Sequence, residues 1–131
     1  MSKNILIIDD DLVSQFALKY TIQQSNFDCE VLVCDGAQEG LGILSNLLKA
    51  GKDLPDFIFL DLDMPELDGW DFLDRYRTIG DTANRTKVFI LSTFTSSLDR
   101  DRAKHHSMVE GFYDKPLSRN SVNQILKSRL E

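Results

Sequence analysis

The sequence predicts an α/β protein with one parallel β-sheet and helices packed on both faces. Short, continuously apolar runs alternate with segments whose apolar residues recur at helical spacing, and this alternation is typical of a parallel sheet. The runs have strand length, and a strand buried on both faces is apolar throughout. Polar residues follow directly after four of the runs, which are Ile5–Ile8, Phe57–Leu60, Val88–Leu91 and Gly111–Tyr113.

The first half of the chain contains two strand–helix pairs and a third strand. Ile5–Ile8 is the first strand, and the apolar stripe that follows it at i, i+3, i+4 and i+7 predicts a helix. That stripe consists of Val13, Phe16, Ala17 and Tyr20. Val31–Cys34 is the second strand, and the stripe of the second helix is Ala37, Leu41, Leu44 and Leu48. Phe57–Leu60 then forms the third strand.

The second half continues the alternation. We expect Pro65 to open a third helix near its first turn, where the missing N–H costs nothing, with Phe72, Leu73, Tyr76 and Ile79 on the buried face. Residues 80–86 are polar and are expected to form a loop. Val88–Leu91 is the fourth strand. Residues 97–107 should form a weakly held helix, because Leu98 and Ala103 are nearly its only apolar residues. After a short strand at Phe112 and Tyr113, Ser118 can cap a last helix whose inward residues are Val122, Ile125 and Leu126.

Size and charge restrict the class of protein. A chain of 131 residues suits one domain, residues 1–131, and too few residues follow Arg129 for an output domain. The net charge of −6 argues against non-specific nucleic-acid binding. The N-terminus leads straight into a strand, which indicates no signal peptide and no membrane span, so we expect a cytoplasmic protein. Cys29 and Cys34 have odd spacing on one strand and should face opposite sides as free thiols.

Carboxylates follow two of the strands at the point where each strand ends. Asp9, Asp10 and Asp11 follow the first strand, and Asp61 follows the third. In open parallel sheets, ligands bind at this carboxyl edge. Two carboxylates about 4 Å apart repel by roughly 4 kcal/mol at an effective dielectric near 20, so a cation or a shared proton must offset the repulsion. Oxygen ligands with open positions favour Mg²⁺. Asp11 is instead expected to cap the first helix.

A hydroxyl and an ammonium follow the other two strands. Ser92 can bond its own backbone, as serines at strand ends often do, or donate to a phosphoryl oxygen. Lys115, before Pro116, can form a simple salt bridge or neutralise charge on a transferred phosphoryl group. Taken together with the carboxylates, these groups suggest a centre for a divalent metal and a phosphoryl group.

These segments resemble the receiver domain of bacterial two-component response regulators, of the single-domain, chemotaxis-regulator-like kind, over essentially the whole chain. The matching segments are Ile5–Asp11, Leu60–Gly69, Leu91–Ser92 and Lys115–Pro116, and the second is the most specific. The resemblance implies a flavodoxin-like (βα)5 three-layer sandwich with strand order 2-1-3-4-5. It also implies Mg²⁺ as cofactor and an aspartyl phosphate as the product of phosphoryl transfer.

The resemblance implies a role for each matching residue. Asp61 is similar to the phosphoacceptor. Asp10, Asp61 and the backbone carbonyl of Asp63 are similar to the Mg²⁺ ligands, and Asp9 would bind the metal through water. The remaining matches are similar to the residues that catalyse the transfer or switch the surface, namely Ser92, Lys115 and Phe112.

Partners are likewise implied by the resemblance. The phosphoryl group would come from a phosphohistidine on a sensor histidine kinase or a histidine phosphotransfer protein. The surface of the fourth helix, the fifth strand and the fifth helix would then bind a downstream protein target, with a homodimer as a further possibility. Neither direct nucleic-acid binding nor membrane binding is expected, and the domain would catalyse only its own phosphorylation and dephosphorylation.

The sequence is also compatible with two other functions. A pseudo-receiver would keep the fold and act as a phosphorylation-independent interaction module; the complete set of Asp10, Asp61, Ser92 and Lys115 argues against it. A phosphatase similar to the haloacid dehalogenases would use Asp61 and Asp63 as its paired aspartates. That family places the pair on its first strand, whereas here the pair follows the third, and Met64-Pro65 follows the pair.

Overall fold

The five strands that the structure describes run parallel in one sheet, in the order β2-β1-β3-β4-β5. The computed structural model describes residues 2–79, 86–93 and 96–127. The strands are β1 (Lys3–Ile8), β2 (Cys29–Cys34), β3 (Phe57–Asp61), β4 (Lys87–Ser92) and β5 (Val109–Asp114). The helices are α1 (Leu12–Gln23), α2 (Ala37–Lys49), α3 (Gly69–Ile79), α4 (Ser97–Lys104) and α5 (Arg119–Lys127). The predicted fold class and strand order are therefore confirmed.

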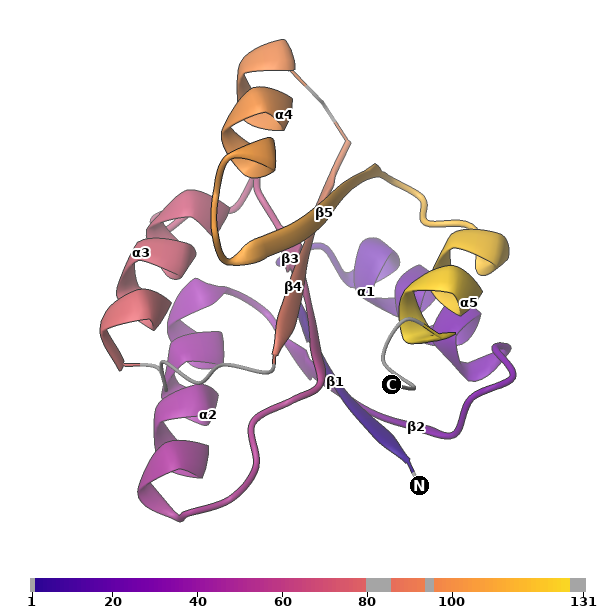
Figure 1. Ribbon diagram of the computed structural model, residues 1–131, viewed down its shortest axis with the longest axis horizontal. Coiled ribbons are helices and arrows are strands. Elements are labelled where there is room, and N and C mark those ends of the chain that lie inside the picture. Colours follow the sequence, from indigo (N-terminus) through magenta and orange to yellow (C-terminus); the bar gives the residue numbers. More distant parts are fainter. Residues whose placement is uncertain (1, 80–85, 94–95, 128–131) are drawn as a thin grey trace.

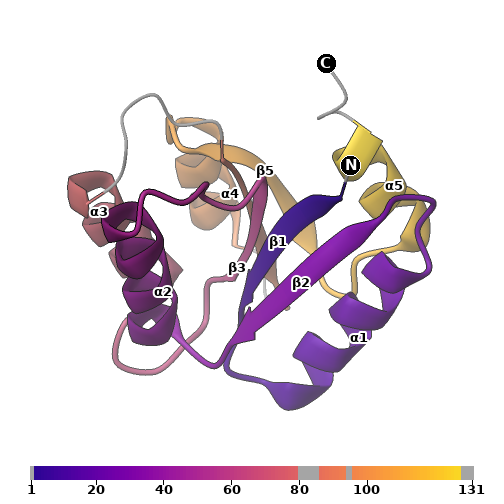
Figure 2. The ribbon, with the colours of Figure 1, turned by 90° about the horizontal axis from the view of Figure 1, so that it is seen from below.

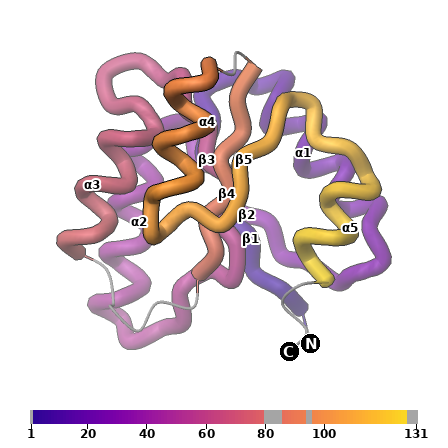
Figure 3. The backbone as a smooth tube through the Cα atoms, turned by 45° about the horizontal axis from the view of Figure 1, so that its top comes forward, coloured from indigo at the N-terminus to yellow at the C-terminus, as the bar shows by residue number. Residues whose placement is uncertain are grey.

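The helices form a layer on each side of the sheet (Figures 1 and 2). One layer contains α2, α3 and α4, and the other contains α1 and α5, which lie side by side in Figure 3 and contact each other. Successive side chains of a strand point to opposite faces. Leu6 and Ile8 therefore join the core under α2 and α3, whereas Ile5 and Ile7 join the core under α1 and α5.

The helix α1 is confirmed, but its expected apolar stripe does not face the core. Its buried residues are Gln15, Leu18 and Ile22. The stripe lies on the solvent side, where Val13 is 76% exposed, Phe16 75% and Tyr20 54%. Leu18 and Ile22 have helical spacing too, so periodicity could not decide which of two apolar faces packs on the sheet. An exposed apolar face on a surface helix is a feature that a binding partner can use.

The helix α3 begins later than the sequence suggested. Pro65 does not open the helix; it lies in the turn before it, and α3 starts at Gly69. The start is fixed by a reciprocal pair, in which the amide of Asp71 donates to the Asp68 carboxylate and the amide of Asp68 donates to the Asp71 carboxylate. This arrangement is a capping box built from two aspartates. The buried face is as expected except for Ile79, which is exposed at the helix end.

Polar contacts rather than apolar burial hold α4. The helix ends at Lys104 and not at Ser107, and Ala103 is its only buried residue. The expected shortage of buried apolar residues on α4 is confirmed, and it goes further than expected because Leu98 is 81% exposed. Ser96 caps the helix by accepting a hydrogen bond from the Asp99 amide. The expected loop at residues 80–85 lies outside the described residues.

Other local expectations are confirmed. Asp11 caps α1 by accepting from the Val13 amide, and Ser118 caps α5 by accepting from the Ser121 amide. Both cysteines are free thiols. Burial raises the pKa of the Cys34 thiol to about 12, so this side chain stays neutral at physiological pH.

Candidate functional site

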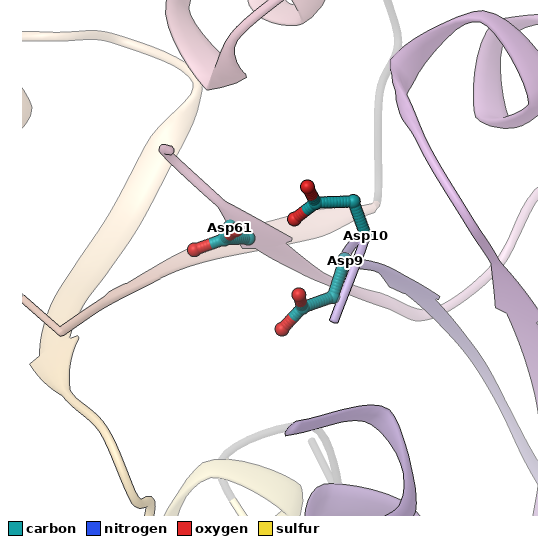
Figure 4. Close-up of side chains that lie close together, drawn as sticks. All are labelled: Asp9, Asp10 and Asp61. Carbon is teal, nitrogen blue, oxygen red and sulfur yellow. The ribbon is translucent and has the colours of Figure 1, made fainter. Parts of the chain in front are cut away.

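Three carboxylates meet at the carboxyl edge of the sheet. Ile8 in β1 pairs with Leu60 in β3, so Asp9 and Asp61 come at neighbouring strand ends. Asp9, Asp10 and Asp61 each offer a carboxylate oxygen, and the three atoms lie within 4.8 Å of one another (Figure 4). Asp9 and Asp61 are buried, at 4% and 5% exposed, whereas Asp10 is exposed. The convergence that the sequence predicted is confirmed for these three residues.

Lys115 joins the cluster from the end of β5. Its ammonium lies 2.7 Å from Oδ2 of Asp9 and 3.1 Å from Oδ1 of Asp61. Burial alone would lower the pKa of Lys115, but its contacts with the two carboxylates outweigh burial and raise the pKa. Lys115 therefore carries a positive charge that links the ends of β1 and β3.

The buried carboxyl group of Asp61 is hard to ionise. Burial, together with the charge of Asp9, raises the pKa of Asp61 from its ordinary value of 3.8 to about 6, and Lys115 counteracts only part of this rise. Metal-free Asp61 is therefore ionised at neutral pH at a cost in free energy. A cation placed between Asp61 and its acidic neighbours would remove that cost.

The cluster fits the magnesium ion that the resemblance to receiver domains implies. Its donors are carboxylate oxygens, which hard divalent cations prefer. Both oxygens of Asp9 already have partners, since Oδ1 accepts from the Asp11 amide at 2.9 Å and Oδ2 accepts from Lys115. Asp9 is thus suited to contact an ion through water, whereas Asp10 and Asp61 are suited to bind it directly.

Ser92 and Phe112, which were also expected at the site, occupy different positions relative to the cluster. Ser92 is fully buried at the end of β4, and its hydroxyl donates to Oδ2 of Asp63 at 3.3 Å. Phe112 is half-buried in β5 and packs beneath α4, with the Arg100 guanidinium 5.2 Å from its ring centroid. Phe112 therefore contacts the charged face of α4 rather than the carboxylates.

Sequence reasoning missed two residues of α1 that support the site. The hydroxyl of Ser14 accepts from the Lys115 ammonium at 3.3 Å and donates to Asp11 at 3.0 Å. The buried amide of Gln15 donates to the Asp9 carbonyl at 2.6 Å and to Asp35 at 2.9 Å. A sequence signal existed, because Gln15 shares the helix face of Leu18 and Ile22 and a polar group there must find a partner.

Gly69 fixes the loop that follows Asp61. Its amide donates to the Leu62 carbonyl at 3.0 Å. A Cβ at this position would lie 2.9 Å from the Asp61 carbonyl oxygen and 3.1 Å from Cα of Leu62, and backbone atoms cannot yield as a flexible side chain can. The first turn of α3 therefore packs against the backbone of the phosphoacceptor candidate only because residue 69 has no side chain.

Gly69→Ala is accordingly expected to destabilise the domain by roughly 1–3 kcal/mol through overpacking and to slow any reaction at Asp61. Gly42→Ala is the matched control, since a Cβ there meets nothing within 4 Å on the exposed face of α2. The control should stabilise the protein by about 0.5–1 kcal/mol. Urea unfolding measures both; equal effects of the two substitutions would contradict the close approach at Gly69.

A groove of about 290 Å³ leads from the site onto α1. Asp9, Lys115 and Thr93 line it at the site end, and Val13 and Ala17 line it on the helix. The exposed apolar face of α1, which we define as Leu12, Val13, Phe16 and Tyr20, is continuous with this groove through Val13. The acidic cluster with Lys115 and the exposed apolar face of α1 thus share one edge of the molecule.

A flavodoxin-like parallel sheet with this acidic cluster and lysine at its carboxyl edge defines a receiver domain. The response regulator receiver domain family matches residues 5–127, and the chain belongs to this family. Receiver domains are the phosphoacceptor domains of two-component signalling. Among the described residues, no helix is long and apolar enough to cross a membrane.

Known proteins support the same assignment. The chain is 27% identical, over 94% of its length, to hybrid signal transduction histidine kinase L of Dictyostelium discoideum. It is 27% identical, over 95% of its length, to osmosensing histidine protein kinase SLN1 of Saccharomyces cerevisiae. It spans only 7% and 10% of those two proteins. The structure of a two component response regulator from Cytophaga hutchinsonii is 25% identical with a TM-score of 0.91, covering 99% of this chain and 97% of that one.

Proposed function

We propose that this receiver domain is a Mg²⁺-dependent phosphorylation switch with Asp61 as its phosphoacceptor. The observation that carries the proposal is the contact of Lys115 with both Asp9 and Asp61 inside a cluster of three carboxylates. Asp10, Asp61 and the backbone carbonyl of Asp63 would bind the ion, and Asp9 would contact it through water. When bound, Mg²⁺ supplies positive charge to the phosphoryl oxygens.

In the transfer step, a carboxylate oxygen of Asp61 forms the new bond to phosphorus while the bond between phosphorus and the histidine nitrogen of the donor breaks. The nitrogen keeps the bonding electron pair. Lys115 lies next to Asp61 and neutralises charge on the transferred group, and Ser92 can donate a hydrogen bond to it. Phosphoryl transfer depends mainly on such positioning and charge neutralisation.

The phosphodonor would be a sensor histidine kinase or a histidine phosphotransfer protein, and we propose that it docks on the exposed apolar face of α1. Its phosphohistidine must come within bonding distance of Asp61, so its surface must cover the edge where the groove opens. That edge continues into Val13 and Phe16, each about three-quarters exposed. Apolar surface of this kind is what a docking partner buries.

The readout surface would be α4, β5 and α5, the face that a downstream protein target or a second copy would recognise. Arg100 of α4 binds both carboxylate oxygens of Asp114 at 2.8 and 3.0 Å and lies over the Phe112 ring. On the other side, the Trp70 indole donates to Asp99 at 3.2 Å. A turn of Phe112 towards the site would remove the ring from Arg100, so α4 would lose this contact with β5.

Intact mass after incubation with Mg²⁺ and acetyl phosphate tests the proposal. The wild type should gain one phosphoryl group, and the gain should disappear with a chelator and in Asp61→Asn. Incorporation by Asp61→Asn at the wild-type rate would show that Asp61 is not the acceptor. No incorporation by the wild type, with acetyl phosphate and with phosphoramidate, would favour the pseudo-receiver instead.

Two further parts belong to the proposal. Catalysis would be limited to the domain's own phosphorylation and dephosphorylation, so steady release of product from a phosphate monoester would favour the phosphatase reading. The cytoplasmic location expected from the sequence also stays a proposal. The whole protein's partners are proposals too, because the chain spans 7–15% of the length of the first curated relatives.

A further inference from the structure

The side chain of Asp63 contacts the buried hydroxyl that the proposed function needs for the phosphoryl group. Asp63 follows Asp61 by two residues and its side chain is exposed, whereas Ser92 is 0% exposed at the end of β4. The Ser92 hydroxyl donates to Oδ2 of Asp63 at 3.3 Å. The contact joins the ends of two neighbouring strands, since Asp61 pairs with Leu91.

We propose that Asp63 is a positioning residue that holds the Ser92 hydroxyl in the unphosphorylated protein and thereby slows phosphorylation of Asp61. This inference rests on the proposed function and deepens it, because it assigns a regulator of the reaction rate within the same site. A hydroxyl has one hydrogen to donate. While that hydrogen points to Asp63, it cannot point to an oxygen of the incoming phosphoryl group.

Asp63 and the phosphoryl group compete for the hydrogen of the Ser92 hydroxyl. Asp63 is the favoured acceptor before the reaction, and the phosphoryl group is favoured after it. A carboxylate is a stronger acceptor than a neutral oxygen, so the Ser92 hydroxyl prefers Asp63 as long as no phosphoryl group is present. In the phosphorylated protein, Asp63 loses its donor and faces the added negative charge of the phosphoryl group. Asp63 thus opposes phosphorylation through its hydrogen bond and also through its charge.

Two substitutions separate the hydrogen bond from the charge. Asp63→Asn removes the charge but keeps an oxygen that can accept from Ser92, and Asp63→Ala removes both. The two variants have equal charge and the same backbone carbonyl, so calorimetric titration should give them equal affinity for Mg²⁺. Position 63 is exposed, and both variants should fold as the wild type does.

The measurement is the rate of phosphoryl incorporation by intact mass, over a series of acetyl phosphate concentrations with Mg²⁺. Asp63→Ala should react roughly three- to tenfold faster than Asp63→Asn, the size expected for one hydrogen bond. Asp63→Ala should have the higher maximal rate, whereas the acetyl phosphate concentration at half-maximal rate should be the same for both variants. The reason is that the Ser92 hydroxyl acts on the transferred group. A loss of packing alone would not raise the maximal rate.

The same pair in a Ser92→Ala background gives the decisive comparison. If Asp63 acts through Ser92, the difference between Asp63→Ala and Asp63→Asn should vanish there. A difference that persists in this background would come from access to the site and would overturn the inference. Equal rates of the two variants with Ser92 present would overturn it as well. If the wild type gained no phosphoryl group at all, the proposed function itself would fail. The two outcomes that would overturn the inference about Asp63 both require a wild type that is phosphorylated, so the wild-type rate separates the two failures.

Discussion

Metal-free Asp61→Asn is expected to be more stable than the wild type at pH 8, by about 3 kcal/mol. The wild-type protein must hold Asp61 ionised at this pH although burial and Asp9 raise its pKa to about 6. The neutral amide of asparagine has nearly the same shape and carries no charge. The substitution that should abolish phosphorylation should therefore strengthen the fold, as expected where a site stores destabilising charge for function.

The sign of this difference in stability follows from the pKa values of Asp61 in the folded and in the unfolded chain. In the folded protein the pKa is about 6, and in the unfolded chain it is near the ordinary 3.8. The folded state thus holds the proton more tightly, so the contribution of Asp61 to stability is full below pH 3.8 and is lost as the pH rises through about 6. The difference in pKa corresponds to about 3 kcal/mol above pH 7 and to about half of that at pH 5.

Urea unfolding in the presence of a chelator, at pH 8 and at pH 5, measures this difference. Asp28→Asn is the matched control, because it removes one negative charge from an exposed position and should change stability by less than about 0.5 kcal/mol. Saturating Mg²⁺ should raise the stability of the wild type much more than that of Asp61→Asn. A variant no more stable than the wild type at pH 8 would show that Asp61 is ionised without cost.

The sequence was sufficient for the fold and for the acidic site because both depend on local features. Continuous apolar runs of strand length, such as Phe57–Leu60, indicate strands buried on both faces, and a parallel sheet brings the residues that follow them to one edge. The positions of Asp61 and Lys115 followed from this geometry. The supporting contacts of Gln15 did not, since they depend on which face of α1 packs on the sheet.

Contacts between side chains far apart in the sequence could not be predicted. The contacts that hold α4 are one example. Arg100 forms an ion pair with Asp114, and Asp99 accepts a hydrogen bond from Trp70. Both contacts join elements whose relative placement the sequence does not give. The start of α3 was not predicted either, although the contacts that fix it are local. Pro65 is compatible with a first helical turn, but the reciprocal bonds of Asp68 and Asp71 place the start of the helix four residues later.

The exposed face of α1 leads to the second prediction with a large effect. Phe16→Ala is expected to slow phosphoryl transfer from a protein donor by roughly 30-fold or more, the effect of removing one aromatic hot spot from an interface. The donor is any histidine phosphotransfer domain that loads the wild-type chain. Transfer from acetyl phosphate should change less than twofold, because Phe16 does not belong to the carboxylate cluster and a small donor needs no docking surface.

The matched control is Leu98→Ala, which removes a side chain that is 81% exposed on α4, compared with 75% for Phe16. Both substitutions remove exposed apolar surface, so both should leave the free energy of unfolding within about 0.5 kcal/mol of the wild type. The rates are measured by intact mass with each donor. Equal losses with the protein donor and with acetyl phosphate would mean that Phe16 acts on the site itself. A loss for Leu98→Ala but not for Phe16→Ala would place the docking surface on α4, and the apolar face of α1 would then need another partner.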